Sequence, residues 1–197
     1  MKNTYTFLLL ILAAFFAASC NSSPPAATGG TIDLQGFNAT NIPGSDAKLV
    51  TKKSADGKML EQGVVRNSQK DGSWTVFHDN ESIKSITGYI NGVLNGAHLE
   101  FNKRGQLVKR VEYLNNQFHG LYGEYKYGRP LKEINYVEGV QEGTFRIWND
   151  MGKMTQKGNN SNGKLDGTLQ YFDEEENLIM QYEYKNGEVE EGGGLVN

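Results

Sequence analysis

The sequence predicts an all-β protein: an elongated, single-layer, twisted antiparallel sheet of about six tandem β-hairpin repeats. The first observation is a period of about 24 residues, marked by the column glycines Gly72, Gly96, Gly120, Gly143 and Gly167 at steps of 24, 24, 23 and 24 residues. The others are columns of aromatic residues in register with these glycines and a turn signal in every unit. Such a period is typical of repeat arrays, in which one unit cannot bury its apolar face alone.

Residues 1–19 read as an export signal. Lys2 precedes an apolar run at residues 7–18, which is too short to span a bilayer as a helix, and small residues lead to Cys20, the only cysteine. This arrangement resembles the bacterial lipoprotein signal, which implies a lipid such as palmitate on Cys20 and attachment to a membrane of the cell envelope. Because Asn21 is not an Asp, we expect the outer membrane. Ordinary secretory cleavage that leaves a free thiol at Cys20, or a misassigned chain start, are the alternatives.

Residues 20–47 are rich in Ser, Pro, Ala, Thr and Gly and carry few bulky apolar side chains. Such a segment buries too little surface to offset its chain entropy, so we expect a flexible tether behind Cys20. Ile32, Leu34 and Phe37 are the exception, and we expect them to pack on the first repeat.

Residues 48–192 form the predicted repeat domain, followed by a tail at residues 193–197. Each column glycine precedes a run of strand-forming residues, such as GTFRIWND after Gln141-Glu142, and then a turn. A second strand carries an apolar column (Ile83, Leu107, Leu131, Met154 and Leu178) and a tyrosine column (Tyr89, Tyr113, Tyr136 and Tyr184). It ends in signals such as Asn91-Gly92, the strongest short predictor of a type I′ turn. A first unit without the column glycine begins near Lys48.

Two columns of rings follow the column glycines. The column five positions after the glycine contains Phe77, Phe101, Tyr125, Trp148 and Phe172, and the column two positions after it contains Trp74, His98, Tyr122, Phe145 and Leu169. Because the columns are three positions apart, we expect them on opposite faces of the sheet unless a bulge resets the alternation. We expect the five-position column to form the core. For the two-position column, core and ligand groove stay open, and Trp74, His98, Tyr122 and Phe145 are the candidate binding face.

The period, the spacing Gly-x-aromatic-x-x-aromatic and the closing Tyr-x-Asn-Gly resemble the bacterial MORN-repeat-variant family over roughly residues 48–192. This resemblance implies an elongated sheet of successive hairpins. Relatives in eukaryotes are scaffolds, and bacterial variants are described as antitoxin-like. The stretch Lys157–Gly163 departs from the pattern, with Asn159 where tyrosine is expected, so we expect the weakest packing there.

No catalytic, cofactor or metal site is predicted. The three histidines, His78, His98 and His119, lie in different units, so convergent metal ligands are not expected. The acidic run at residues 173–176 reads as a solvated turn. With a formal charge of −3 and no basic cluster, the chain is not expected to bind nucleic acid.

These features predict a non-catalytic, membrane-anchored lipoprotein of the bacterial envelope that acts as a repeat scaffold. Its expected partner is a protein or an envelope polysaccharide. The alternative is an antitoxin-like or immunity protein that neutralises one partner stoichiometrically. An export signal argues against a cytoplasmic antitoxin but not against an immunity protein of the envelope.

Overall fold

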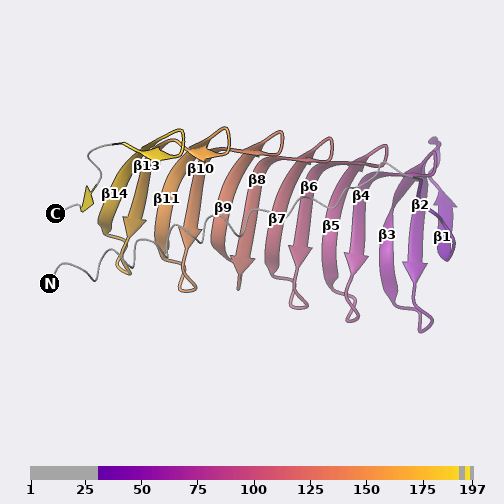
Figure 1. Cartoon of the computed structure of the whole chain (residues 1–197). Coiled ribbons are helices and arrows are strands. Elements are labelled where there is room, and N and C mark those ends of the chain that lie inside the picture. The colour runs from indigo at the N-terminus through magenta and orange to yellow at the C-terminus, as the bar shows by residue number, and fades with distance from the viewer. Residues whose placement is uncertain (1–30, 191–193, 196–197) are drawn as a thin grey trace.

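The computed structural model describes residues 31–190 and the backbone of residues 194–195. They form one open antiparallel sheet in which the strands follow one another in sequence order (Figure 1). The predicted fold class is confirmed, and no helix occurs within these ranges. The strands are β1 Phe37–Asn41, β2 Lys48–Lys53, β3 Met59–Arg66, β4 Gln69–Phe77, β5 Ile83–Ile90, β6 Val93–Phe101, β7 Leu107–Leu114, β8 Gln117–Lys126, β9 Arg129–Val137, β10 Val140–Trp148, β11 Met154–Ser161, β12 Lys164–Leu165, β13 Gly167–Phe172, β14 Leu178–Lys185, β15 Glu188–Val189 and β16 Gly194–Leu195.

Each repeat is one hairpin, and the first begins with β2 at Lys48, where the sequence places it. The short strand β12 and strand β13 both pair with β11, so together they serve as the first strand of the sixth hairpin. The six units are therefore β2–β3, β4–β5, β6–β7, β8–β9, β10–β11 and β12/β13–β14.

Two-residue turns join consecutive units and confirm the predicted type I′ geometry. Both central residues have positive φ, as at Asn91 (48°) and Gly92 (77°), and at Asn115 (50°) and Asn116 (66°). The N–H of the second turn residue donates to a carbonyl of the preceding unit, as from Gly92 to Lys70 at 2.8 Å. Each turn between units thus adds a backbone hydrogen bond, which forms only when the strands next to the turn are paired in register.

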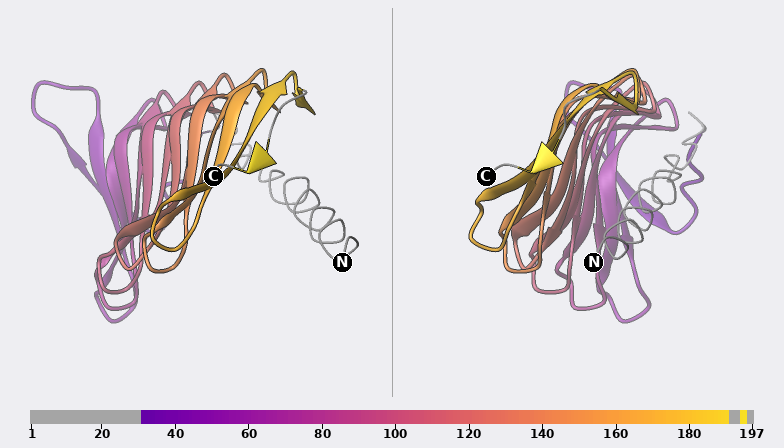
Figure 2. Two further views of the ribbon diagram at one scale, coloured as in Figure 1. Left: turned by 90° about the vertical axis from the view of Figure 1, so that its left-hand side faces the viewer. Right: turned by 60° about the vertical axis from the view of Figure 1, so that its left-hand side comes forward.

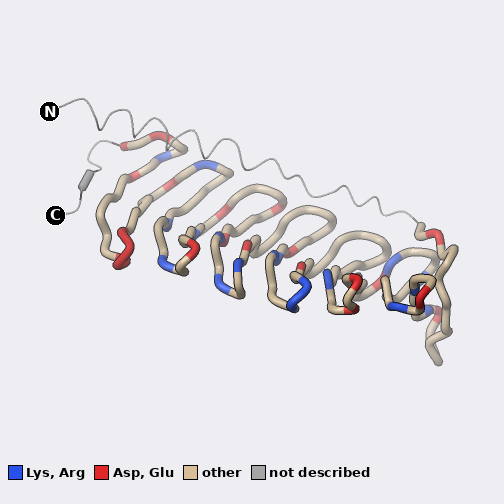
Figure 3. Tube along the Cα trace, turned by 90° about the horizontal axis from the view of Figure 1, so that it is seen from below, with Lys and Arg blue, Asp and Glu red and all other residues tan. Residues whose placement is uncertain are grey.

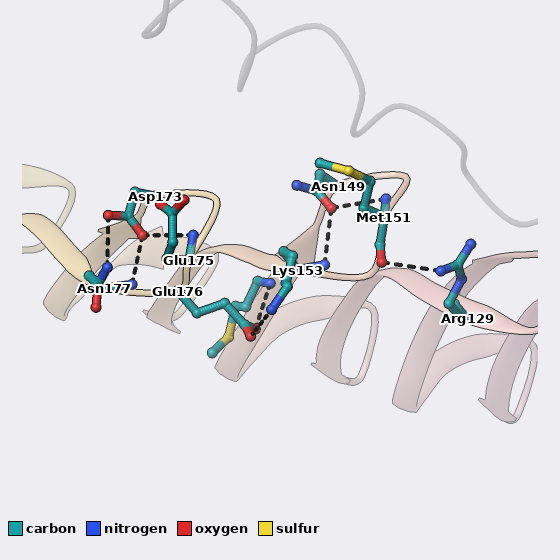
Figure 4. A network of polar contacts seen from close by, with 9 residues as sticks. Arg129, Asn149, Met151, Lys153, Asp173, Glu175, Glu176 and Asn177 are labelled. Atoms are coloured by element: carbon teal, nitrogen blue, oxygen red, sulfur yellow. Dashed lines mark hydrogen bonds and ion pairs between the residues drawn. The ribbon is translucent and has the colours of Figure 1, made fainter.

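The turns within the hairpins are closed by side chains. Asn149 Oδ1 accepts from the N–H groups of Met151 and Lys153, each at 3.0 Å, and Asp173 Oδ1 accepts from Glu175 at 3.0 Å and Asn177 at 2.8 Å (Figure 4). Asn and Asp favour such turns because their short side chains reach the backbone two residues further on. Asn102 makes the equivalent bonds in the third unit.

One hairpin turn is shorter than the others, which explains the single 23-residue step. Lys126 pairs directly with Arg129 across the two-residue turn Tyr127-Gly128, whose φ values are 54° and 77°. As a result Pro130 pairs with Tyr125, so Pro130 and not Leu131 occupies the expected apolar column in this unit.

The strands bend at the column glycines. Gly72 pairs regularly with Tyr89 on one side, but the register with the preceding strand shifts between Gly63–Trp74 and Val65–Lys70. The five column glycines have φ between 80° and 102°, a region that side chains with a Cβ rarely adopt. The sheet consequently curves over near the turns between units, as Figure 2 shows.

The core is a row of side chains that crosses the sheet on the inside of this curve, the inner face. Its members lie on successive strands, most of them as cross-strand partners, and Gly158 lies next to Leu169. They are Val50, Gly63, Trp74, Thr87, His98, Val111, Tyr122, Ile134, Phe145, Gly158, Leu169 and Tyr182. We call this set the core row. Large residues of the core row lie beside small ones. Phe145, for example, lies beside Gly158, where an added Cβ would be only 2.6 Å from Cζ of Phe145. Bending brings the tyrosine column onto the same core, where Tyr113 packs against Phe118 at 5.3 Å between ring centroids.

Three expectations about the repeat and its ends are corrected. Strand β1 pairs with β2, so this part of the expected tether belongs to the sheet, and Ile32, Leu34 and Phe37 pack on the first core cluster as predicted. Asn160, not Asn159, stands at the tyrosine position, because it pairs with Gly143 as Tyr113 pairs with Gly96. Strand β16 pairs with β14, so the tail contributes to the sheet.

Candidate functional site

The candidate binding face belongs largely to the core. Trp74 and Phe145 are each 2% exposed and Tyr122 is 8% exposed. Their polar atoms are satisfied internally: Trp74 Nε1 donates to Glu61 at 3.0 Å, and the Tyr122 hydroxyl donates to Glu124 at 2.6 Å. Burial and the bond to Glu124 raise the pKa of Tyr122. The groove interpretation of this column is therefore corrected: its side chains face the inside of the curved sheet.

His98 is the least buried of these four residues, with 21% of its side chain exposed. Its ring lies between the Thr87 hydroxyl, 2.8 Å from Nδ1, and Glu100 Oε1, 3.0 Å from Nε2. Both ring nitrogens thus have partners, as in a structural histidine of the core row.

The five-position column forms a second row on the opposite face, the outer face. We call Phe77, Phe101, Tyr125, Trp148 and Phe172 the ring row. The register shifts next to every one of these rings, and in each case the extra residue lies in the following strand, as Lys84 does between Ile83 and Ser85. The strand that carries the ring therefore keeps its alternation, and the two aromatic columns point to opposite faces as predicted.

The ring row is not the buried core that the sequence analysis expects. All five side chains are half-buried, whereas the aromatic core residues of the two-position column are almost fully buried. The physical reason is the bend at the column glycines, which covers the inner face only. A half-buried ring in each of five successive units is the most regular feature of the outer face.

Tyr125, at the centre of this row, lies back along its own strand. A Cβ on Gly123 would lie 2.6 Å from the hydroxyl oxygen and 2.9 Å from Cζ of Tyr125, so the ring fills the space that a side chain at position 123 would take. The Tyr125 hydroxyl donates to Glu133 Oε1 at 3.5 Å. Burial and the Glu133 carboxylate raise the pKa of Tyr125. The ring of Tyr125 therefore lies over Gly123 on the outer face and stays half-buried.

A line of polar side chains runs beside the ring row on the outer face. Cross-strand pairing connects Arg110, Gly123, Glu133, Arg146, Lys157 and Gln170 in that order. We call Arg110, Glu133, Arg146, Lys157 and Gln170 the polar row. The sequence contained a signal for the polar row. Each of its residues either lies two positions before a ring in the same strand or pairs across strands with a residue that does. The bulges that set the register are not visible in the sequence, so the polar row could not be predicted from it.

One nitrogen of the Arg110 side chain has a hydrogen-bond partner and another has none. Its Nη2 pairs with the Glu112 carboxylate, whose Oε2 also accepts from Leu121 N at 3.2 Å. Burial acts to raise the pKa of Glu112, but the bonds from Arg110 and Leu121 outweigh it and hold that pKa below its usual value. The Arg110 Nε–H is buried without an acceptor, which is costly unless a further group supplies one.

The charged residues at the hairpin turns mostly bind one another. Lys103 pairs with Asp79 at 2.8 Å and Lys153 pairs with Glu176 at 3.2 Å, each linking the turns of successive units. Figure 3 shows these charges gathered along the turns. Asp173 of the acidic run closes its own turn, and no group of three His, Cys, Asp or Glu side chains within the described ranges could hold a metal ion.

The predicted signal and Cys20 lie outside the described residues. In the part of the chain that the structure describes, no helix has the length and apolar character needed to cross a membrane. No protein-family model matches the sequence, and no curated protein matches it either.

Proposed function

We propose that this protein is a non-catalytic scaffold of the bacterial envelope, anchored through lipid on Cys20, that binds its partner along the outer face of the sheet. The observation that carries this proposal is the ring row with its adjacent polar row. Half-buried rings recur in five successive units, and the polar row accompanies them from β7 to β13, which is the pattern of an extended binding surface more than of a single catalytic cleft.

The position of the first described residues supports an anchored arrangement. Ile32 N donates to Ser68 O at 2.7 Å, at a turn between units. Ile32, twelve residues after Cys20 in the sequence, is therefore held at the edge of the sheet where the turns between units lie.

Co-purification from detergent-solubilised membranes tests the scaffold. Wild-type protein is expected to retain a partner that a Tyr125→Ala, Trp148→Ala variant loses, while Tyr127→Asn, on the neighbouring turn, retains it. Capture of the same partner by the wild type and by both variants contradicts binding along the ring row. Recovery of one stoichiometric toxic protein supports the immunity alternative instead.

The anchor has its own test. Cys20→Ser is expected to move the protein out of the membrane fraction, with the mass of the acyl chains lost from its N-terminal peptide. A Cys20→Ser protein that stays in the membrane contradicts lipid anchoring without affecting the outer-face proposal.

A further inference from the structure

We infer that the outer face binds a linear, β-1,4-linked polysaccharide that carries carboxylate groups, aligned across the strands on the ring row. This inference rests on the proposed function and names the chemistry of its partner. It follows from the spacing of the rings, the orientation of Tyr125 and the charges of the polar row.

The spacing is set by the hairpin repeat. Two strands separate successive rings, and strands lie about 4.7 to 4.9 Å apart, so neighbouring rings are roughly 10 Å apart. This distance is close to the length of one disaccharide in an extended β-1,4-linked glycan. A chain crossing the strands can therefore place one disaccharide on each unit, with every second sugar over a ring.

The orientation of Tyr125 suits stacking against a sugar. Its ring lies over Gly123 on the outer face and is only half-buried, and pyranose rings pack their C–H groups on exposed aromatic surface of this kind. Phe101 and Trp148 occupy the same column in the adjacent units. An aromatic platform of this kind contributes contact area at little cost in conformational entropy.

The polar row supplies hydrogen bonds and charge. Arg110, Arg146 and Lys157 lie in that row with Glu133, and Glu112 on the same face pairs with Arg110, so one positive charge is in excess and Arg146 and Lys157 are the cations that a ligand can meet. Guanidinium groups bind carboxylates with matched, charge-assisted hydrogen bonds.

An extended peptide is the main competing occupant. It could also use rings and polar groups, but its natural alignment is along a free strand edge, where its backbone finds partners. The ring row runs perpendicular to the strands in the middle of the sheet, where the backbone groups are already paired. A polymer whose recognition needs no backbone ladder fits this geometry better.

Calorimetry with full-length protein in detergent micelles tests the inference. The probes are hexasaccharides of β-1,4-linked glucose and of β-1,4-linked glucuronate, which share a backbone and differ only at the C6 carboxylate, and α-1,4-linked maltohexaose. We expect the glucuronate hexamer to bind tightest, and about tenfold more tightly than its disaccharide because further rings are engaged. Equal binding of maltohexaose, or no binding of either β-linked hexamer, overturns the inference.

Variants locate the site. Tyr125→Ala is expected to weaken binding of the glucuronate hexamer by about tenfold, as for loss of one aromatic anchor, whereas Tyr125→Phe and Tyr127→Asn keep it. Gly123→Ala, which displaces the ring without removing it, is expected to weaken binding similarly. Arg110→Gln is expected to reduce the difference in affinity between the glucuronate hexamer and the glucose hexamer. Unchanged affinity in folded Tyr125→Ala and Gly123→Ala proteins overturns the site.

The same measurements separate this inference from the proposed function. If the hexamers do not bind but the Tyr125→Ala, Trp148→Ala variant still loses a protein partner from membranes, the glycan is wrong and the scaffold stands. If neither experiment depends on the ring row, both are wrong.

Discussion

The aromatic side chains of this protein fall into two classes, which differ in burial and in how much they stabilise the fold. Trp74 is 2% exposed, donates to Glu61 and lies under the Lys70 ammonium, whose nitrogen is 4.1 Å from the ring centroid. Trp148 is half-buried on the other face. The same residue type therefore occupies a core position and a surface position within one repeat pattern.

Replacing each tryptophan by alanine measures this difference. Trp74→Ala is expected to lower the free energy of unfolding by about 3 to 5 kcal/mol, as for a fully buried aromatic ring. Trp148→Ala is expected to cost less than Trp74→Ala, because part of its surface already contacts water. Urea denaturation followed by circular dichroism measures both, and equal losses would contradict the assignment of the two faces.

Glycines opposite large rings make the core row specific. A Cβ on Gly158 would also lie 3.0 Å from Cδ1 of Leu169, in addition to its overlap with Phe145. Gly158→Ala is expected to destabilise the protein by about 1 to 3 kcal/mol through overpacking. The double variant Gly158→Ala, Phe145→Leu should recover part of this loss in a double-mutant cycle. Additive effects of the two substitutions would show that the contact does not limit the packing.

Which aromatic column forms the core could not be predicted from the sequence. Both ring columns were legible, and their placement on opposite faces followed from alternation. The choice of core depended on which face the sheet curves toward, and that depends on register shifts at glycines such as Gly72. The glycines are visible in the sequence, but they do not indicate toward which face the sheet bends, so the core was assigned to the wrong column.

The hairpin is the element in which local sequence predicted structure best. Type I′ turns were expected from Asn-Gly pairs, and the structure extends them to Asn67-Ser68, where φ is 49° and 60°. Short-range backbone chemistry decides these turns, because both residues must tolerate positive φ. Tyr127-Gly128 was not recognised as such a turn, since tyrosine gives no signal for positive φ.

The turn closed by Asp173 makes stability depend on pH. Hydrogen bonds from the side chain and backbone of Asn177, with a further one from Glu175, hold the pKa of Asp173 below its ordinary value of 3.8. A carboxyl whose pKa is lowered on folding stabilises the protein above its unfolded pKa and loses that contribution as the pH falls through the folded pKa. Stability is therefore expected to decline below about pH 3.8 in part through this residue.

Asp173→Asn isolates that contribution. Asn149 and Asn102 already close equivalent turns, so the variant should keep the turn while removing the titration. We expect the urea midpoint of Asp173→Asn to fall less than that of the wild type as the pH is lowered from neutral to below 3.8. Parallel curves for the two proteins would assign the acid sensitivity to other carboxylates, such as Asp166 and Glu176, whose pKa values are also lowered by hydrogen bonds.

At the scale of the whole molecule, the repeat makes stability a sum over neighbouring units. Contacts join consecutive strands, and the turns between units hydrogen-bond to the preceding unit, as Gly92 does to Lys70. The described N-terminal segment caps the first unit, since Phe37 packs on Trp74 at 5.8 Å between centroids. The period alone predicted this modular architecture, whereas the cap and the curvature required the register of the strands.

Removing one complete unit tests the modular architecture directly. Deletion of residues 96–119 joins Asn95 to Gly120, so a hybrid strand retains the column glycine, and Gly120 keeps its own partner Tyr136. In a quasi-one-dimensional array, we expect the shortened protein to fold cooperatively, with an m value in urea lower by roughly one sixth and a modest loss in the free energy of unfolding. Deletion of half a unit, from Gly96 to Leu107, is the matched control: it leaves an odd number of strands and reverses every later one, so it should unfold the C-terminal half. If both deletions unfold the chain equally, the units are not independent and the sheet depends on long-range contacts that the strand order does not reveal.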